Sequence, residues 1–495
     1  MEEMIIPFSF KANMDYTFCM STDELPHTIA AIETAARGRR TGAFFDVDGA
    51  VIAGELEPIA SAPRRPGLSD LGAAVQHRLG RGPQAPGDEV AAVVAGARDV
   101  EVAELDQRGR KAFARSIADK VHPEVRELVG AHRRRGHTIV LTSSATPSQV
   151  RPIAEALGVD EILCSEPQVK DGRLTGELAG PAFVGEAAAE AVERFASSHG
   201  LDLGRSHAYA SSDLGAPLLA LVGHPHAVNP TKGLSRRVSS EGWPVLHFDS
   251  RGRPSPETVV RSVAGYGALL PSMLGGVAVG LLNRDRHEIA QYGVSSYVER
   301  LFAITGVTLD VQGEEHLWSH RPAVFIYNHR NNFDPYVAIK LVRRDWGSVA
   351  KKEIAGPLTG VMQWLTPNVA FIDRSDSAKA VEGLQPVTEL LRSGVSVLVA
   401  PEGTRSTSGQ LGTFKKGPFR MAMDAGVPIV PIVIRNADRV AGRGAGIIRR
   451  GTVDVAVLPP VSVADWTAED LEDRIAGVRQ RFAETIADWP SRSEP

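Results

Sequence analysis

The sequence predicts two α/β domains in one chain of 495 residues, with an apolar helical segment between them. In both halves, short apolar runs that end in polar turns alternate with helical stretches. This pattern is typical of doubly wound, mostly parallel sheets. The segment 263–282 separates the two series and contains no charged residue. The length of the chain also exceeds that of one ordinary domain.

The first half is expected to hold an extension over 1–40 and an α/β domain over 41–250. Its strands are expected at 43–45, 137–144 and 206–212, where apolar runs end in turn or hydroxyl residues. Residues 53–120 are helical in period, with a break at 80–88 that is rich in Pro and Gly. The stretch 251–257 has the composition of a linker, rich in Pro, Ser, Arg and Gly.

The apolar segment suggests contact with a membrane. It is long enough to cross a bilayer, but its five glycines and Pro271 weaken it as a simple spanning helix. A single span would also place the two halves on opposite sides of the membrane, although both look cytoplasmic. We therefore expect 258–300 to form membrane-associating helices that dip into one leaflet. A true span and a buried helix pair are the alternatives.

The second domain is expected over 301–495, with strands at 322–328, 396–401, 427–434 and 453–459. The run 427–434 contains two prolines, which lack the N–H group that a sheet ladder uses, so we expect it at an edge or mouth of the sheet. The first of these runs leads into His329 and, five residues later, Asp334. A carboxylate at this spacing can fold back on the imidazole, and the other ring nitrogen can then act as a base. Structural alternatives are a helix N-cap for Asp334, before Pro335, and a satisfied polar strand end for His329.

The remaining blocks bring positive charge to the ends of apolar runs. The turn after 396–401 consists of Glu402, Gly403, Thr404 and Arg405. Its backbone N–H groups can face an anion, and an arginine offers a planar fork suited to phosphate. Arg374 follows another short apolar run, and a structural ion pair with Asp373 or Asp376 is the alternative. Lys415 and Lys416 stand before an expected helix.

The sequence resembles the glycerolipid acyltransferase family, which includes 1-acylglycerol-3-phosphate acyltransferase, in four blocks that follow one another over about 105 residues: 329–334, 371–374, 402–406 with 414–417, and 427–432. The resemblance implies His329 as general base and Asp334 as its orienting partner. It implies that the phosphate end of the acceptor is held by the other charged blocks: Arg374, Glu402, Gly403, Thr404, Arg405, Lys415 and Lys416. It also implies an acyl-CoA or acyl-carrier-protein donor, and no cofactor or metal for acyl transfer.

The first half carries a second set of chemical residues. Asp46 and Asp48 lie two residues apart on a tight loop after a strand, as in phosphatases that use an aspartate nucleophile. With Ser143, they resemble the haloacid-dehalogenase-like family, serine-phosphatase branch. The resemblance implies that the helical stretch 53–120 is a cap over the sheet. A turn-capping pair is the structural alternative.

Several residues of that family are missing here. Ala50 replaces its threonine, Ala188 aligns with its phosphate-binding lysine, and Ser211 and Gly215 stand where its late acids, one of them a magnesium ligand, are usual. Without that positive charge, two carboxylates would repel a phosphate group. We therefore expect an inactive phosphatase, with Mg²⁺ at Asp46 and Asp48 only if the domain is active. Substitution from neighbouring positions is the alternative: Asp213, with Lys170 or Lys232.

The expected function is acyl transfer to lysophosphatidic acid, giving phosphatidic acid, at the cytoplasmic face of a membrane. Alternatives are a bifunctional protein with an active phosphate-monoester hydrolase, and acylation of another lysophospholipid with the first domain as a scaffold. The net charge of −4 argues against nucleic acid as a partner. Two cysteines exclude a disulfide framework. His122, His207, His224 and His226 show no metal-ligand spacing and are expected to be structural.

Overall fold

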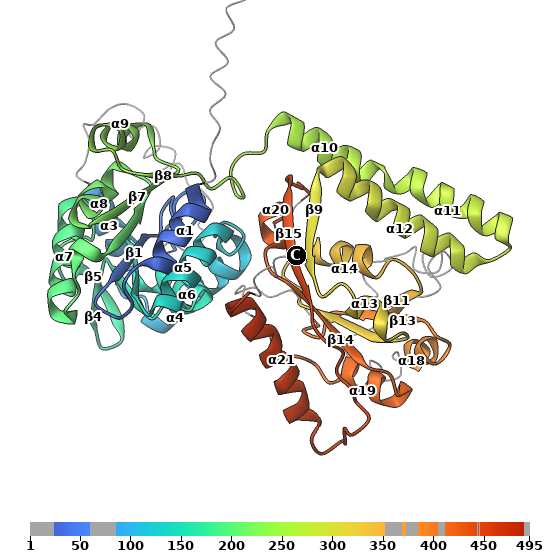
Figure 1. Ribbon diagram of the computed structural model, residues 1–495. Coiled ribbons are helices and arrows are strands. Elements are labelled where there is room, and N and C mark those ends of the chain that lie inside the picture. The colour runs from blue at the N-terminus through green and yellow to red at the C-terminus, as the bar shows by residue number, and fades with distance from the viewer. Residues whose placement is uncertain are drawn as a thin grey trace, which may run out of the picture.

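The computed structural model describes residues 24–59, 86–351, 369–372, 385–403, 411–442, 444 and 446–489. Within these ranges the chain forms two α/β domains, joined by a long helical segment (Figure 1). The fold class predicted from the sequence, with a parallel sheet first and a second α/β domain after an apolar helix, is confirmed.

The first domain is built on a parallel sheet of six strands in the order β3-β2-β1-β6-β7-β8. The strands are β1 (Gly42–Asp46), β2 (Thr138–Ser143), β3 (Glu161–Cys164), β6 (His207–Ala210), β7 (His224–Val228) and β8 (Val245–Leu246). A hairpin of β4 (Pro167–Lys170) and β5 (Arg173–Leu178) stands apart from this sheet. The central strand β1 is buried along its length up to Asp46, so the chain emerges from the core at that carboxylate.

Helices surround this sheet (Figure 1). They are α1 (Glu24–Thr34), α3 (Pro86–Ala95), α4 (Val102–Ala112), α5 (Pro123–Arg135), α6 (Pro147–Leu157), α7 (Gly185–His199), α8 (Ala216–Leu221) and α9 (Lys232–Glu241). Of these, α3 and α4 lie in the stretch expected to form a cap. Several helices end at a glycine in the left-handed region, such as Gly136 after α5, where a side chain would be strained.

The connecting segment forms α10 (Pro256–Gly267) and α11 (Leu269–Asn283), and α12 (Arg286–Thr305) returns antiparallel to α11 (Figure 1). The glycines of α11 have a packing role. A Cβ atom on Gly276 would lie 2.4 Å from the Ile289 carbonyl oxygen, and one on Gly280 would lie 2.2 Å from the Ile289 side chain. These glycines let α11 and α12 approach closely. The opposite face of α10 and α11 is apolar and exposed.

The second domain contains seven strands in the order β12-β11-β13-β10-β14-β15-β9. They are β9 (Val307–Gln312), β10 (Val324–Tyr327), β11 (Trp346–Lys351), β12 (Val369–Ile372), β13 (Ser396–Val399), β14 (Ile429–Ile434) and β15 (Gly451–Val457). All neighbours are parallel except β14 and β15, which makes this sheet mixed. The helices are α13 (His316–Ser319), α14 (Asp334–Val342), α18 (Gln385–Arg392), α19 (Gly417–Ala425), α20 (Ala437–Val440) and α21 (Leu471–Ala487).

The expectation that the two-proline run lies at a sheet edge is wrong. Strand β14 is an interior strand between β10 and β15. Pro428 precedes the strand. Pro431 lies just outside the antiparallel pairing with β15, which covers Ile432 to Ile434. The Pro431 carbonyl still accepts the N–H of Leu458, at 2.9 Å. The sheet therefore accommodates the missing N–H group at the end of a ladder rather than at an edge.

The two domains touch through polar groups. Arg439 of α20 pairs with Glu127 of α5, with 2.8 Å between guanidinium nitrogen and carboxylate oxygen. Arg251, in the linker, donates to the carbonyl of Asp438 at 2.8 Å. The linker is thus fixed to the surface of the second domain.

Candidate active site

The site of the second domain begins at the carboxyl end of β10. The strand is buried, and Asn328 directly after it is fastened to the neighbouring strand β14. The Asn328 side chain donates to the Ile434 carbonyl and accepts the Ile434 N–H, both at 2.8 Å. These two hydrogen bonds to the sheet fix the backbone immediately before His329.

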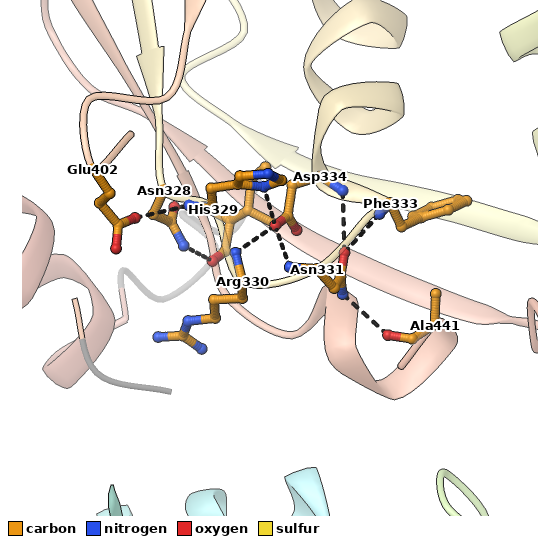
Figure 2. Close-up of polar contacts among 9 residues, drawn as sticks. Asn328, His329, Arg330, Asn331, Phe333, Asp334, Glu402 and Ala441 are labelled. Atoms are coloured by element: carbon orange, nitrogen blue, oxygen red, sulfur yellow. Dashed lines mark hydrogen bonds and ion pairs between the residues drawn. The ribbon is translucent and has the colours of Figure 1, made fainter. Parts of the chain in front are cut away.

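His329 and Asp334 meet as the sequence predicts (Figure 2). His329 Nδ1 lies 3.2 Å from Asp334 Oδ2. The same carboxylate oxygen accepts the N–H groups of Arg330, at 2.6 Å, and Asn331, at 2.8 Å. The Asp334 side chain is 1% exposed, whereas that of His329 is 20% exposed. With Nδ1–H donated to the carboxylate, Nε2 carries the lone pair that a base needs.

The Asp334 carboxylate does not cap its own helix. The carboxylate turns back to the loop 329–331. The backbone N–H of Asp334 donates to Asn331 Oδ1 at 3.1 Å. Asn331 Oδ1 also accepts the N–H of Phe333, at 2.8 Å, and Asn331 Nδ2 donates to the carbonyl of Ala441 at 3.0 Å. A closed network therefore holds this loop in one conformation (Figure 2).

Glu402 reaches this loop from the turn after β13. Its Oε1 accepts the backbone N–H of His329, and its Oε2 accepts that of Gly412, both at 2.8 Å. Burial raises the pKa of Glu402, and these two backbone donors oppose the shift. A Cβ atom on Gly412 would lie only 2.7 Å from Oε2, so the approach requires a glycine. Glu402 thus joins two loops. Its predicted part in binding phosphate stays a prediction.

The other predicted phosphate-binding residues are only partly placed. Arg374, Thr404 and Arg405 lie outside the described residues. Gly403 adopts a φ of 74°, in the left-handed region. The Lys415 backbone N–H donates to the Pro401 carbonyl at 2.7 Å, which brings an exposed ammonium chain beside the turn. Lys416 is exposed and pairs with Glu472 of α21.

Sequence reasoning missed the residues that hold the base in place. These residues do not act on a substrate themselves. Asn328 bonds to β14, Asn331 bonds to Ala441 after α20, and Gly412 bonds to Glu402 in the turn after β13. A polar residue at the end of a buried strand, such as Asn328, is the one signal that could have suggested them.

The first domain has a cavity of about 630 Å³ at the carboxyl end of its sheet, with Asp48 in its wall. Asp48 Oδ1 accepts the Leu56 N–H at 2.7 Å. Burial and the neighbouring Asp48 carboxylate raise the pKa of Asp46 well above its ordinary value. Burial also raises the pKa of Asp48, and a hydrogen bond with Ser143 opposes that shift. The three predicted residues are therefore together.

The positions of the missing acids also lie at this site. A Cβ atom on Gly49 would lie 2.6 Å from Ser211 Oγ, and one on Gly215 would lie 3.5 Å from Asp46 Oδ2. Neither Ser211 nor Gly215 supplies a carboxylate. Asp213 lies against Gly233, where a Cβ atom would come within 1.9 Å of its Oδ2. Magnesium prefers an octahedral set of oxygens with anionic ligands. Asp46, Asp48 and Ser143 offer two carboxyl groups and one hydroxyl, and positions 211 and 215 add no further carboxylate to complete that set.

Comparisons with known proteins agree with this division. Residues 308–435 match the family model described as Acyltransferase, and residues 43–216 match that of haloacid dehalogenase-like hydrolases. The 1-acyl-sn-glycerol-3-phosphate acyltransferase of Brassica napus is 30% identical over 254 residues, 49% of this chain and 72% of that protein. That of Limnanthes alba is 29% identical over 192 residues, 38% of this chain and 66% of that protein.

The first domain has relatives of its own. A probable phosphatase of Mycobacterium tuberculosis is 34% identical over 173 residues, 34% of this chain and 60% of that protein.

A solved acyltransferase structure is also similar to this chain. The 1-acyl-sn-glycerophosphate acyltransferase of Thermotoga maritima has 23% identity and a TM-score of 0.40 over 48% of this chain and 98% of that one. The chain belongs to the 1-acyl-sn-glycerol-3-phosphate acyltransferase family through its second domain, and a haloacid dehalogenase-like domain precedes that domain.

Proposed function

We propose that the chain transfers a fatty acyl group from a thioester, acyl-CoA or acyl carrier protein, to the free hydroxyl of 1-acylglycerol 3-phosphate, forming phosphatidic acid. The observation that carries this proposal is the half-buried His329 imidazole, held through Nδ1 by the buried Asp334 carboxylate. The related plant acyltransferases, by their names, use this acceptor.

The chemistry follows from the orientation of the ring. His329 Nε2 takes the proton of the glycerol hydroxyl, whose oxygen forms a bond to the thioester carbonyl carbon. The tetrahedral intermediate collapses with breakage of the carbon–sulfur bond, and the imidazolium returns its proton to the leaving thiolate. Asp334 stabilises the imidazolium and keeps Nδ1 protonated. No cofactor or metal takes part in this scheme.

The acceptor phosphate is assigned to Lys415, which lies beside the Glu402 turn, and, as the family resemblance implies, to Arg374 and Arg405. A carboxylate whose oxygens already accept two backbone N–H groups is a poor partner for a phosphate. We therefore give Glu402 a positioning role, in which it aligns the His329 backbone with the turn that receives the acceptor.

The exposed apolar face of α10 and α11 supports a membrane location. The stretch Pro256–Asn283 is long and apolar enough to cross a membrane, which is weak support by itself. On the protein surface, large apolar side chains project from these helices: Val260, Val263, Leu270, Leu274, Leu281 and Leu282. Because α12 returns along α11 to the second domain, we propose that the helices lie in the cytoplasmic leaflet, with both domains on one side.

We further propose that the first domain has no phosphatase activity. Phosphoryl transfer depends on positive charge at the transferring group. Ala188, Ser211 and Gly215 stand where the family has its lysine and late acids, so these positions supply neither the positive charge nor the carboxylates. A bifunctional protein remains the second candidate, because Asp46, Asp48 and Ser143 are together around a cavity.

The first proposal is tested with purified full-length protein, acyl-CoA or acyl carrier protein donors, and a panel of lysophospholipids, with products identified by mass spectrometry. His329→Ala should abolish formation of phosphatidic acid, whereas His320→Ala, at an exposed histidine of the same domain, should leave it unchanged. Turnover retained by a folded His329→Ala variant contradicts the assignment of the base.

The second proposal is tested by phosphate release from phosphoserine and p-nitrophenyl phosphate in the presence of Mg²⁺. Wild type and Asp46→Asn should release phosphate at the same background rate. Release that depends on Asp46 would show that the first domain is an active hydrolase.

A further inference from the structure

The first domain contains a group of buried histidines at the end of its sheet opposite to Asp46. His207 begins β6 and is paired with Ala43 at the start of β1, whereas Asp46 ends that strand. The separation of three residues along a strand corresponds to about 10 Å. His132 comes from the last turn of α5, and His137 from the loop before β2. The three side chains therefore come from separate segments.

The ring nitrogens of these histidines converge. One nitrogen from each of His132, His137 and His207 lies within 4.8 Å of the other two. The Nδ1 atoms of His132 and His137 are already 2.9 Å apart. Two nitrogens bound to one tetrahedral zinc ion are about 3.3 Å apart, given bonds of about 2.0–2.1 Å. Small side-chain rotations would bring the third nitrogen to that distance.

The outward nitrogens of two of these rings have the partners that metal-bound histidines usually have. His137 Nε2 is 2.9 Å from the Ala36 carbonyl oxygen, and His132 Nε2 is 2.9 Å from the Tyr209 hydroxyl. A ligating histidine commonly donates its second N–H to such an oxygen, which fixes the tautomer and the orientation of the ring. With both Nε2 atoms protonated, both Nδ1 atoms present lone pairs to the same point.

His207 supplies the observation that hydrogen bonds alone leave unexplained. A chain of bonds from Tyr209 through His132 and His137 to Ala36 would satisfy those residues without a metal. It leaves His207 with both ring nitrogens buried and without a hydrogen-bond partner among the described residues. A neutral imidazole has one nitrogen with a free lone pair, and His207 uses neither nitrogen in a hydrogen bond to the described residues. An unpaired buried nitrogen costs free energy that a metal bond would remove.

We propose that His132, His137 and His207 bind one divalent ion of the zinc class inside the haloacid dehalogenase-like domain. Three neutral imidazoles suit zinc, cobalt, nickel or copper, and they do not suit magnesium or calcium, which prefer oxygen ligands. The exposed His224 ring stacks on His207, with 4.6 Å between centroids, and offers a first contact for an ion entering from the surface. The role of the ion is structural, because it joins α5, β6 and the loop before β2.

The test uses the full-length chain, purified without a polyhistidine tag and stripped with a chelator. Titration with Co²⁺ should give visible absorption bands of four-coordinate cobalt that saturate at one equivalent, and Zn²⁺ should remove them. Either ion should raise the melting temperature of the first domain, since ligands that bind only the folded state stabilise it. A stripped wild-type chain that gives no bands and no shift in melting temperature overturns the proposal.

His207→Phe keeps the stacked ring and should eliminate the cobalt bands. His122→Phe is the matched control, because His122 is also buried with both ring nitrogens unpartnered but is not in the group, and it should bind cobalt like wild type. If His207→Phe does not fold, His137→Gln should weaken cobalt binding at least tenfold. Binding that survives either variant of the group, or that is lost in His122→Phe, overturns the proposal.

Discussion

The backbone N–H of His329 donates to Glu402 Oε1 at 2.8 Å, so the residue that bears the base is fastened to the turn after β13. Glu402→Gln retains the shape but only one accepting oxygen, and it should lower kcat about tenfold or more through misalignment of the base. The KM for lysophosphatidic acid should change little if Glu402 only positions the loop. A rise in KM with an unchanged kcat would instead indicate that Glu402 contributes to acceptor binding.

Asp334→Asn should reduce kcat by about 10⁴-fold, the size of effect known for the equivalent change in a serine protease triad. An amide can donate to Nδ1, which would place the proton on Nε2 and remove the base. The protein should remain folded, which circular dichroism can check. A variant with activity within tenfold of wild type would show that His329 does not depend on this carboxylate.

The close packing of α11 on α12 can be tested with adjacent glycines. Gly276→Ala puts a methyl group 2.4 Å from the Ile289 carbonyl oxygen and should lower the free energy of unfolding by about 1–3 kcal/mol. At Gly275 the added Cβ meets Tyr292 at an ordinary 3.6 Å, so Gly275→Ala should be neutral or stabilising by up to about 1 kcal/mol. Equal effects of the two substitutions on thermal unfolding would contradict this packing.

Membrane binding should depend on the exposed leucines of α11. Leu270→Asp combined with Leu281→Asp removes two apolar side chains that are 68% and 71% exposed. In the membrane-bound state these leucines would be buried in the bilayer. Losing both corresponds to about 100-fold weaker binding or more, at about 1.5–3 kcal/mol for each side chain. Cosedimentation with anionic phospholipid vesicles measures this. Val169→Asp, at an exposed valine of the first domain, should bind like wild type.

His122 should make the first domain sensitive to acid. Burial, with a smaller effect of Arg251, lowers the pKa of His122 from 6.5 to about 4. Between these values the unfolded chain binds a proton that the folded chain does not, so stability rises with pH and is lost as the pH falls below 6.5. Compared with His122→Gln, the wild-type unfolding free energy should fall more steeply, by up to about 1.4 kcal/mol per pH unit. Parallel curves for the two proteins from pH 6.5 to 4.5 would rule out a buried neutral His122.

Local patterns predicted the parts of the fold and site that depend on neighbouring residues. The apolar runs that end at Asp46 and His329 are buried strands, because a short run followed by a turn has few other ways to bury its side chains. The spacing of His329 and Asp334 was sufficient to predict their contact, since five residues across a strand–helix turn bring both side chains to one point.

Features that depend on distant segments escaped prediction. Pro431 suggests an edge strand until the end of the β15 ladder is known. The glycines of α11 weaken it as an isolated helix, yet they match the surface of α12. His207 is far in sequence from His132 and His137, and only the folded sheet brings the three histidines together. In each case the partner is far away in the sequence.

The pairing of β9 with β15 has a consequence for biosynthesis. Val307 is aligned with Gly451, so β9 cannot pair with its neighbour β15 until the ribosome has synthesised β15. At about 5–20 residues per second, that interval lasts roughly 7–30 s. During it, the haloacid dehalogenase-like domain and the apolar α10–α11 helices have already been made. Under the membrane location that we propose, nascent chains therefore have time to reach a bilayer before this sheet closes, so that attachment can precede completion of the second domain.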